Sequence, residues 1–423
     1  MTFPYPAVAG GTSLLSHARE LKSENLGGHF EIGVGARVIR DDGKIFVDWE
    51  MGLLGILLGH ADPEVGEAVE CAVDDGIASL PLGHSLETDV AKTILRLAGQ
   101  DNGQVRFVLS GSAACSAAVR IARAITGRDT VISIGYHGVD DWALAHTPPA
   151  WGVPGWARVF TFAEKYNDLA GVASRFEADE DIACVIVETE TTESPAPGYL
   201  QGIRDLCTKY GAAMIADECI VAGRYPEFTG WRHYGVEPDM WVTSKVLTNG
   251  LPLGAVIGKR EWMRGFDFDF RPDYADTGIG PIYISGTHSA NGICLAAAAK
   301  CLSVWERDEV PLQLENQGRQ LRASLLATIS DCGLDKHIAV KGPYYRLLLD
   351  APDLRHKTAL MHSLVENGHI IGSGWNLCNS HGDAERESMQ EAWVIACQDL
   401  RRRISEDDWS GIGRTVLSPY RQS

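Results

Sequence analysis

The feature that most constrains the fold is a regular alternation of short apolar runs and amphipathic stretches between about residues 105 and 260. Runs rich in β-branched residues have the length of strands: VRFVLS, TVISIGY, ACVIVETE, AMIADEC, DMWVTS and GAVIGK. Between several of them lie segments with apolar residues at helical spacing and a closing glycine, such as ACSAAVRIARAITG and GYLQGIRDLCTKYG. This alternation predicts an α/β fold in which helices cover both faces of a largely parallel sheet.

A chain of 423 residues is too long for one simple core, so a large domain with a smaller one is expected. After about residue 305 long helical stretches with a few short strands predict a small α+β domain over residues 306–423. Residues 51–305 are then expected to form the large domain. Residues 1–50 contain the hairpin-like GARVIRDDGKIFVDWE and are expected to pack with the small domain.

Composition excludes several classes of protein. The net charge of −18 opposes binding to nucleic acid, and it suits either a cationic substrate or simple solubility. The ten cysteines are scattered without a CxxC pair, which predicts small buried side chains in a reducing compartment rather than a metal site or disulfides. No apolar segment has the length of a membrane span, and the first residues lack the pattern of a signal peptide. A cytoplasmic location is therefore expected.

Polar residues stand where the predicted strands end, and ligands of open α/β sheets bind at the carboxyl ends of strands. These residues are Ser110, Tyr136, Glu188, Asp217 and Lys245. A lysine after an apolar strand is either an ordinary surface residue or an amine that attacks a carbonyl group.

Three of these strand ends have two interpretations each. Ser110-Gly111-Ser112 opens a small-residue helix, which suits either a phosphate cradle or a plain helix cap. Asp217 requires a cationic or hydrogen-bonding partner, which suits either a protonated pyridine nitrogen or a helix cap or structural salt bridge. Tyr136-His137-Gly138 is either a platform for a planar ring or an ordinary loop.

Five motifs, in order, carry a resemblance: SGSAA, YHG, IADEC, SKVLTNGLPLGAVIGK and SGTHSANGICLAAAA. Over roughly residues 30–410 the chain resembles class III, fold-type I aminotransferases that use pyridoxal 5'-phosphate. It is most similar to their glutamate-1-semialdehyde aminomutase branch, on KYNDLAGV and GVEPDM among other stretches.

The resemblance implies a role for each matching residue. Lys245 forms a Schiff base with the cofactor and then moves a proton as a free amine, for which we expect its pKa to fall. Asp217 pairs with the pyridine nitrogen, and Tyr136 stacks on the ring. The implied cofactor-binding residues are Ser110, Gly111, Ser112, Tyr136, His137, Glu188, Asp217, Cys219, Lys245 and Thr287. Thr287 would reach the phosphate of a neighbouring subunit, so a homodimer is implied.

The chain departs from the family pattern in several motifs. Ser112-Ala113-Ala114 replaces Thr-Glu-Ala, which keeps a hydroxyl but loses a glutamate without an evident reason. Cys219 replaces a valine of similar volume, either as packing or as a reactive thiol. Thr189 replaces the proline after Glu188, and Ala222-Gly223-Arg224 keeps only the arginine of Gly-Phe-Arg.

Two further features concern the substrate. The stretch from Lys22 to Val38 has no arginine before Arg37, whereas the aminomutase branch holds a substrate carboxylate with an arginine there. Acidic and aromatic residues gather in two segments that the family places near the site entrance, which suits a polycationic amino sugar or a solvated loop. They are Asp140, Asp141, Trp142, Trp151, Asp267, Asp269, Asp273 and Asp276. Asp140, Trp142 and Glu190 are the expected substrate contacts.

The favoured hypothesis is a transaminase that moves an amino group from glutamate or glutamine to an aldehyde or ketone of an aminoglycoside-like substrate, as in antibiotic biosynthesis. An aminomutase, racemase or epimerase would use the same lysine and is the alternative. A non-catalytic homologue is the third hypothesis, and the retention of both Lys245 and Asp217 argues against it.

Overall fold

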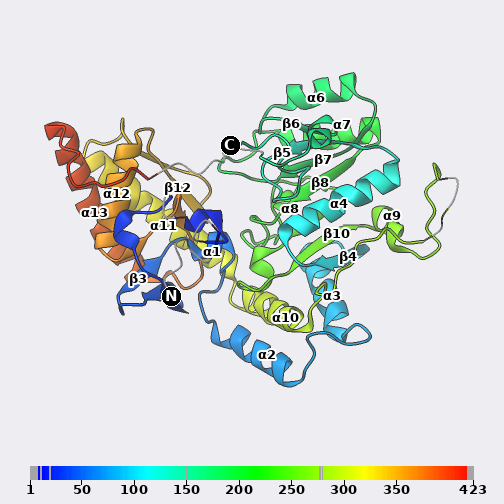
Figure 1. The fold of residues 1–423 in the computed structure, drawn as a ribbon, viewed down its shortest axis with the longest axis horizontal. Coiled ribbons are helices and arrows are strands. Elements are labelled where there is room, and N and C mark those ends of the chain that lie inside the picture. The colour runs from blue at the N-terminus through cyan, green and yellow to red at the C-terminus, as the bar shows by residue number, and fades with distance from the viewer. Residues whose placement is uncertain are drawn as a thin grey trace. The chain divides into compact units, whose positions relative to one another are not determined.

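The structure is a computed structural model that describes residues 8–9, 12–18, 21–148, 151–275, 278 and 280–416. The chain divides into two compact units: one joins the residues up to Asp62 to those from Gln313 onwards, and the other is Pro63–Leu312. The second unit is coloured from light blue to yellow in Figure 1. Among the described residues, none of the helices combines the length and hydrophobicity needed to cross a membrane.

The second unit is built on a seven-stranded sheet with the order β4-β10-β9-β8-β7-β5-β6. Pairing is parallel from β9 to β6, and β10 runs antiparallel to both of its neighbours. The strands are β4 (Gly103–Val108), β5 (Thr130–Ile134), β6 (Thr161–Ala163), β7 (Ile182–Glu188), β8 (Ala213–Asp217), β9 (Met240–Thr243) and β10 (Gly254–Lys259). The predicted α/β fold with a largely parallel sheet is confirmed.

Helices cover both faces of this sheet, as the alternation in sequence predicted. Cys184 and Ile186 of β7 pack with α4, whereas Val185 and Val187 of the same strand pack with α6 and α7. Figure 1 shows α4 and the α6–α7 pair on either side of the strands. The helices of the unit are α2 (Pro63–Asp74), α3 (Ser85–Leu97), α4 (Gly111–Thr126), α5 (Gly155–Val159), α6 (Leu169–Ala178), α7 (Tyr199–Tyr210), α8 (Gly230–His233), α9 (Arg260–Met263) and α10 (Gly292–Arg307).

The first unit contains two small sheets. One has the order β1-β2-β3-β13, and the other has the order β11-β12-β14. The hairpin expected in the first 50 residues is formed by β2 and β3, and β3 also pairs in parallel with β13. The strands are β1 (Phe30–Val34), β2 (Arg37–Arg40), β3 (Ile45–Asp48), β11 (Ala339–Lys341), β12 (Arg346–Asp350), β13 (His369–Ile370) and β14 (Gly374–Asn376).

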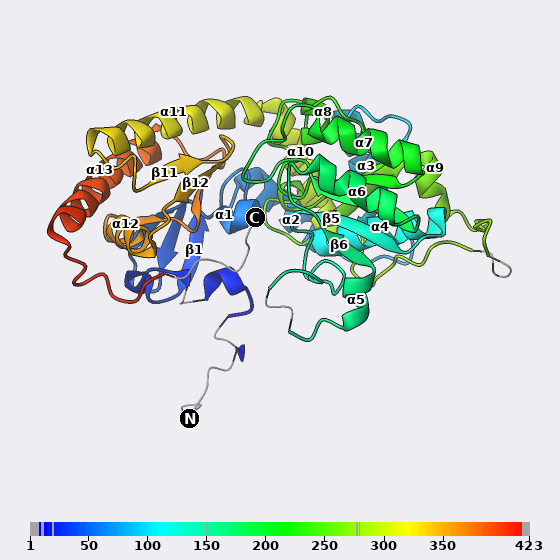
Figure 2. The same cartoon turned by 90° about the horizontal axis from the view of Figure 1, so that it is seen from above.

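Long helices pack against these sheets. The helices are α1 (Met51–Leu54), α11 (Val310–Asp331), α12 (Leu354–Glu366) and α13 (Asp383–Glu406). Figure 2 shows α11 and α13 side by side, where the indole N–H of Trp393 donates to the carbonyl of Leu325 at 3.2 Å. Trp393 also meets Trp375 of β14 edge to face at 5.3 Å, so aromatic rings form the centre of this core.

A histidine pair is buried around Trp49 in the same unit. The ring of His381 stacks on Trp49 with centroids 4.0 Å apart, and the indole N–H donates to Nδ1 of His369 at 3.2 Å. Burial lowers the pKa of both histidines to about 4. Both imidazoles are therefore neutral at pH 7.

Acid is expected to destabilise this unit. Because the pKa of each histidine is lower in the folded chain than its ordinary value of 6.5, stability is full above pH 6.5 and falls as the pH drops toward 4. The loss in the free energy of unfolding is on the order of 3 kcal/mol for each histidine by pH 4. Urea unfolding at pH 7.0, 5.5 and 4.5 measures it, with His29→Gln, at an exposed position, as the control. A free energy that stays constant over this range would contradict the prediction.

Candidate functional site

The carboxyl ends of three parallel strands bring the polar residues of the sequence motifs together. Glu188, the last residue of β7, lies opposite Asp217, the last residue of β8, and Asp217 lies opposite Val242 of β9. Lys245 follows the end of β9 by two residues, in the short 3-10 turn η5 (Lys245–Leu247). The three side chains therefore start from one edge of the sheet.

Asp217 is a buried carboxylate held by donors from three segments. Its Oδ1 accepts the N–H of Cys219 at 3.0 Å, and its Oδ2 lies 2.8 Å from Nδ1 of His137. The Cys115 thiol donates to Oδ2 at 3.4 Å. Burial opposes the charge, but the hydrogen bond and charge of His137 outweigh it, so the pKa of Asp217 is lowered. A buried anion of this kind suits a cationic ring nitrogen.

The turn before α4 has the geometry of an anion cradle. Ser110 caps the helix, because its Oγ accepts the N–H of Ala113 at 3.2 Å. The Oγ of Ser112 accepts the N–H of Val139 at 3.2 Å, which ties the turn to the loop after β5. Gly111 lies so close to the next turn that a Cβ there would come within 2.9 Å of Sγ of Cys219 and 3.4 Å of Cβ of Ser244. The N-terminus of a 16-residue helix thus faces the turn that carries Lys245.

Gly138 makes the closest of these approaches. It has φ of +110°, and a Cβ on it would lie 2.2 Å from Oγ of Ser112. We expect Gly138→Ala to destabilise the protein by roughly 1–3 kcal/mol and to weaken cofactor binding. Thermal unfolding and a cofactor titration measure the two effects.

Gly152→Ala is the matched control for that variant. Gly152 has φ of +82°, but nothing lies within 4 Å of the place where its Cβ would be. Both variants carry the backbone strain of a positive φ, and only Gly138→Ala adds the overlap with Ser112. Equal effects in the two variants would rule out the packed turn as the cause.

Lys245 occupies a strained backbone position. Its φ is +23°, in a region that residues other than glycine rarely adopt. Residues with strained backbones of this kind cluster at functional sites. The preceding Ser244 anchors the turn, because its hydroxyl donates to the carbonyl of Leu253 at 2.6 Å. The turn therefore holds Lys245 in one place.

The charge of Lys245 acts on Cys219. Together with the hydrogen bond from Cys115 it lowers the pKa of the Cys219 thiol, although burial and Asp217 leave that pKa above its usual value. The charges of Lys245 and Asp217 thus both act on the Cys219 thiol. The thiol of Cys219 is protonated, which fits packing better than a reactive nucleophile.

The loop after β5 carries Tyr136 and His137. The N–H of Tyr136 donates to Oε2 of Glu188 at 3.0 Å, and the side chain is half-buried. The ring of His137 lies parallel to that of Trp142 at 6.2 Å, and its Nδ1 contacts Asp217. His137 therefore orients the carboxylate of Asp217, and the ring of Trp142 stacks on that of His137.

The three expected substrate contacts lie in different surroundings. Glu190 is 1% exposed, and its carboxylate accepts the hydroxyls of Tyr225 at 2.7 Å, Tyr234 at 2.6 Å and Ser194 at 2.8 Å. Trp142 is buried, and its indole N–H donates to Oγ of Ser116 at 2.7 Å. Asp140 is exposed and accepts the hydroxyl of the same Ser116. Of the three, Asp140 alone presents its side chain at the surface.

The acidic and aromatic residues expected near the entrance are mostly exposed. Asp141, Asp269 and Asp273 are exposed, Asp267 is half-buried, and Trp151 is 89% exposed. Asp276 lies outside the described residues. Thr287 is exposed, in a turn before α10.

Sequence reasoning missed two contributions to the site. The sequence predicts small buried cysteines, and the thiol of Cys115 in addition contacts Asp217; a cysteine among alanines carries no signal of such a contact. Glu218 is fully buried and accepts the hydroxyl of Thr189 and the N–H groups of Gly230 and Trp231 at 2.8 and 2.9 Å. Burial raises the pKa of Glu218 to about 7. Thr189, at the position of the family proline, thus supports the residue after Asp217.

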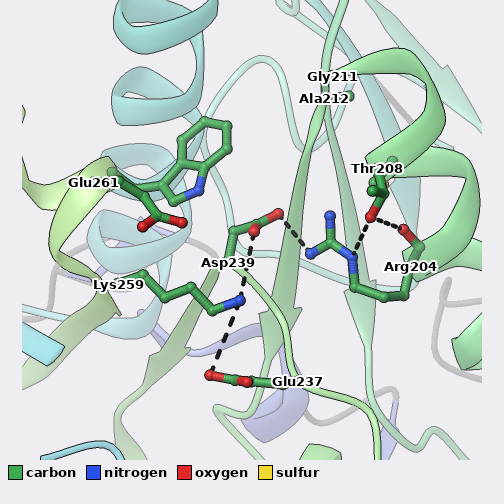
Figure 3. A pocket seen from close by; sticks show the side chains of 10 residues that line it. Arg204, Thr208, Gly211, Ala212, Glu237, Asp239, Lys259 and Glu261 are labelled. Atoms are coloured by element: carbon green, nitrogen blue, oxygen red, sulfur yellow. Dashed lines mark hydrogen bonds and ion pairs between the residues drawn. The ribbon is translucent and has the colours of Figure 1, made fainter. Parts of the chain in front are cut away.

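A charged hollow on the same unit lies at the other end of the strands. Figure 3 shows Arg204, Asp239 and Lys259 in it, with Arg204 and Asp239 paired at 2.6 Å. Asp239 precedes β9, whereas Lys245 follows it. This hollow is therefore separate from the edge that carries Asp217 and Lys245.

Comparison with known proteins agrees with the site. The sequence matches the aminotransferase class-III family over residues 22–379. It is 32% identical over 418 residues to glutamate-1-semialdehyde 2,1-aminomutase 2 of Bacillus thuringiensis strain Al Hakam and of Bacillus cereus strain AH820, covering 91% of this chain and 94% of each relative.

Solved structures have the same fold. A transaminase with PLP bound superimposes with a TM-score of 0.83 at 25% identity, covering 94% of this chain and 96% of that one. An omega-transaminase from Sphaerobacter thermophilus gives a TM-score of 0.81 at 24% identity, with 93% and 95% covered. The buried carboxylate, the strained lysine and the helix N-terminus fit pyridoxal 5'-phosphate. The chain therefore belongs to the class III aminotransferases, pyridoxal 5'-phosphate-dependent enzymes of fold type I.

Proposed function

We propose that the protein is an aminotransferase in which Lys245 is the catalytic residue. The observation that carries the proposal is the convergence of a strained lysine and a buried, ionised aspartate on one sheet edge. Pyridoxal 5'-phosphate supplies an aldehyde that takes up the amino group of the donor and a ring that accepts electrons. Lys245 would hold the cofactor through that aldehyde, and its Nζ as a free amine would move the proton at the donor carbon.

The other residues position the ring and its phosphate. Asp217 would hold the ring nitrogen through the carboxylate that His137 orients. Ser110, Gly111 and Ser112 would hold the phosphate at the N-terminus of α4. Tyr136, whose backbone Glu188 fixes, would supply an aromatic face to the ring. Cys219, which lies beside Gly111, would pack against the cofactor.

The active site is completed by a second copy of the chain. Thr287 is exposed in this unit, and in the proposed homodimer its hydroxyl reaches the phosphate of the neighbouring subunit. Sedimentation of the wild type and cofactor affinity of Thr287→Ala test this arrangement. A monomer with full cofactor affinity would refute it.

The amino acceptor is proposed to be a cationic, hydroxylated molecule such as an amino sugar, with glutamate or glutamine as donor. Asp140, Asp141, Asp269 and Asp273 are exposed, and the chain carries a net charge of −18. Arg37 pairs with Glu385 at 2.9 Å, so its guanidinium already has a carboxylate partner. Glu190 and Trp142 are left out of the proposed contacts, since both are buried and hydrogen-bonded within the chain.

An aminomutase is the second candidate, because the relatives at 32% identity are glutamate-1-semialdehyde 2,1-aminomutases. A racemase or epimerase would return the proton from the other side with the same Lys245. In each case the amino group stays with the substrate carbon skeleton or returns to it.

One screen separates these functions. The holoenzyme is mixed with glutamate or glutamine and, as acceptors, oxidised aminoglycosides or glutamate-1-semialdehyde, and the absorbance of the bound cofactor and the release of keto acid are followed. A transaminase releases one keto acid for each acceptor aminated. Isomerisation of glutamate-1-semialdehyde without keto acid would identify the aminomutase instead. A holoenzyme whose spectrum responds to none of the amines would contradict both.

A further inference from the structure

Two thiols and a carboxylate form a compact buried group in the second unit. Cys115 lies on α4, Asp217 ends β8, and Cys219 lies in the turn that follows. One sulfur or oxygen atom from each lies within 4.8 Å of the other two. We propose that Cys115, Asp217 and Cys219, named here the thiol–carboxylate cluster, bind a soft divalent cation of the Zn²⁺ type.

The separations in the cluster suit a tetrahedral ion. Zinc binds thiolate sulfur at about 2.3 Å and carboxylate oxygen at about 2.0–2.2 Å, which places a sulfur and an oxygen ligand roughly 3.5 Å apart. Sγ of Cys115 and Oδ2 of Asp217 are already 3.4 Å apart. Two sulfur ligands of one ion would be about 3.8 Å apart, and the two thiol sulfurs lie within 4.8 Å of each other. Binding thus requires small side-chain adjustments.

The surroundings hold these ligands in place. The N–H of Cys219 and Nδ1 of His137 contact opposite oxygens of Asp217, at 3.0 and 2.8 Å, which fixes the carboxylate plane. Such hydrogen bonds to a metal ligand raise affinity by orienting it. Sγ of Cys219 packs against Gly111, where a Cβ would come within 2.9 Å. The donors are therefore largely arranged before an ion arrives.

Metal binding would displace protons from the cluster, in which Cys115 and Asp217 are buried and Cys219 is half-buried. Each thiol that becomes a ligand releases its proton to water, so the ion replaces up to two protons and no oxidation occurs. Three protein ligands leave one tetrahedral position for water.

Metal and cofactor exclude each other at this place. Asp217 is the proposed partner of the ring nitrogen, and a carboxylate that holds a metal ion can no longer pair with it. Zn²⁺ is therefore expected to slow loading of the cofactor. This consequence depends on the proposed role of Asp217, whereas metal binding itself does not.

The cysteine spacing rules could not reveal the cluster. Zinc sites are recognised in sequence by ligands a few residues apart, whereas Cys115 and Cys219 come from different strand–helix units. The sequence-based expectation that the scattered cysteines form no metal site stays a prediction, and the metal titration tests it.

Metal titration of the full-length protein, stripped of cofactor and kept reduced with a phosphine, tests the site. Zn²⁺ content after gel filtration gives the stoichiometry, and Co²⁺ gives thiolate charge-transfer absorbance in the near ultraviolet. One ion per chain is expected for the wild type. Cys115→Ser and Cys219→Val should bind it about 100-fold more weakly or worse. Cys71→Ser, which removes an exposed thiol on α2, should bind as the wild type does.

The outcomes are distinct. The metal site is overturned if the wild type retains no ion, or if Cys115→Ser and Cys219→Val retain as much ion as the wild type. In the second arm, pyridoxal 5'-phosphate is added with and without one equivalent of Zn²⁺, and slower loading is expected in the wild type but not in Cys219→Val. If the ion binds through both thiols yet loading is unchanged, the metal site stands and the proposed pairing of Asp217 with the ring nitrogen fails.

Discussion

Lys245→Ala is expected to lower kcat by at least about 10⁴-fold, because it removes both the covalent attachment and the base that moves the proton. The protein should fold normally, since alanine keeps the Cβ of lysine and so adds no strain at φ of +23°. Single-turnover absorbance of the bound cofactor with an amino donor measures the loss. Added small amines should restore a fraction of the rate by taking over the proton transfer.

Lys259→Ala is the matched control for this loss. Lys259 also ends a strand of the same sheet, but it is at the opposite edge, 3.9 Å from both Glu237 and Asp239. Its removal should leave kcat within about twofold, because Lys259 lies at the opposite end of the strands from Asp217 and Lys245. Turnover by Lys245→Ala at a tenth of the wild-type rate or more would overturn the assignment of the catalytic residue.

Asp217→Asn is expected to lower kcat by about 100–1,000-fold and to weaken cofactor retention, because an amide carries no charge to stabilise a cationic ring nitrogen. Burial makes the effect large, since water cannot replace the lost charge at a carboxylate that is 4% exposed. Equilibrium dialysis of the cofactor and stopped-flow absorbance give the two numbers.

Asp239→Asn separates this effect from general destabilisation. Asp239 is a buried carboxylate just before the adjoining strand β9, and it accepts the N–H of Met214 at 2.8 Å and pairs with Arg204. Its loss should lower the melting temperature and leave cofactor affinity unchanged. Equal affinity losses in both variants would show that Asp217 acts only through the fold.

The fold was predictable because its determinants are local and periodic. The apolar runs that became β7 and β8 are too short for helices and are separated by amphipathic stretches with a closing glycine, as at Gly211 after α7. The domain boundaries proposed at residues 50 and 305 stay predictions. The second crossing between the units, after Leu312, has no local mark, since α11 starts before that point and continues past it.

The positions of residues at the ends of strands could be predicted from the sequence, and those of residues in loops less so. Asp217 ends β8 and Lys245 follows the neighbouring strand β9, so the sequence could place both at the same end of the sheet. Glu190 and Trp142 lie in turns, and their surroundings depend on Tyr225, Tyr234 and Ser116, which no spacing rule connects to them. Side-chain partners in irregular segments are set by tertiary packing alone.

The buried titratable groups give the two units opposite responses to acid. Glu218 has a pKa of about 7 in the folded chain against 4.5 ordinarily, so protonation favours its unit as the pH falls from 7 toward 4.5. His369 and His381 disfavour theirs over a similar interval. In calorimetric scans at successively lower pH, the melting temperature of the unit that contains Glu218 should therefore rise relative to that of the unit that contains His369 and His381. The difference between the two melting temperatures is thus set by the pH of the buffer.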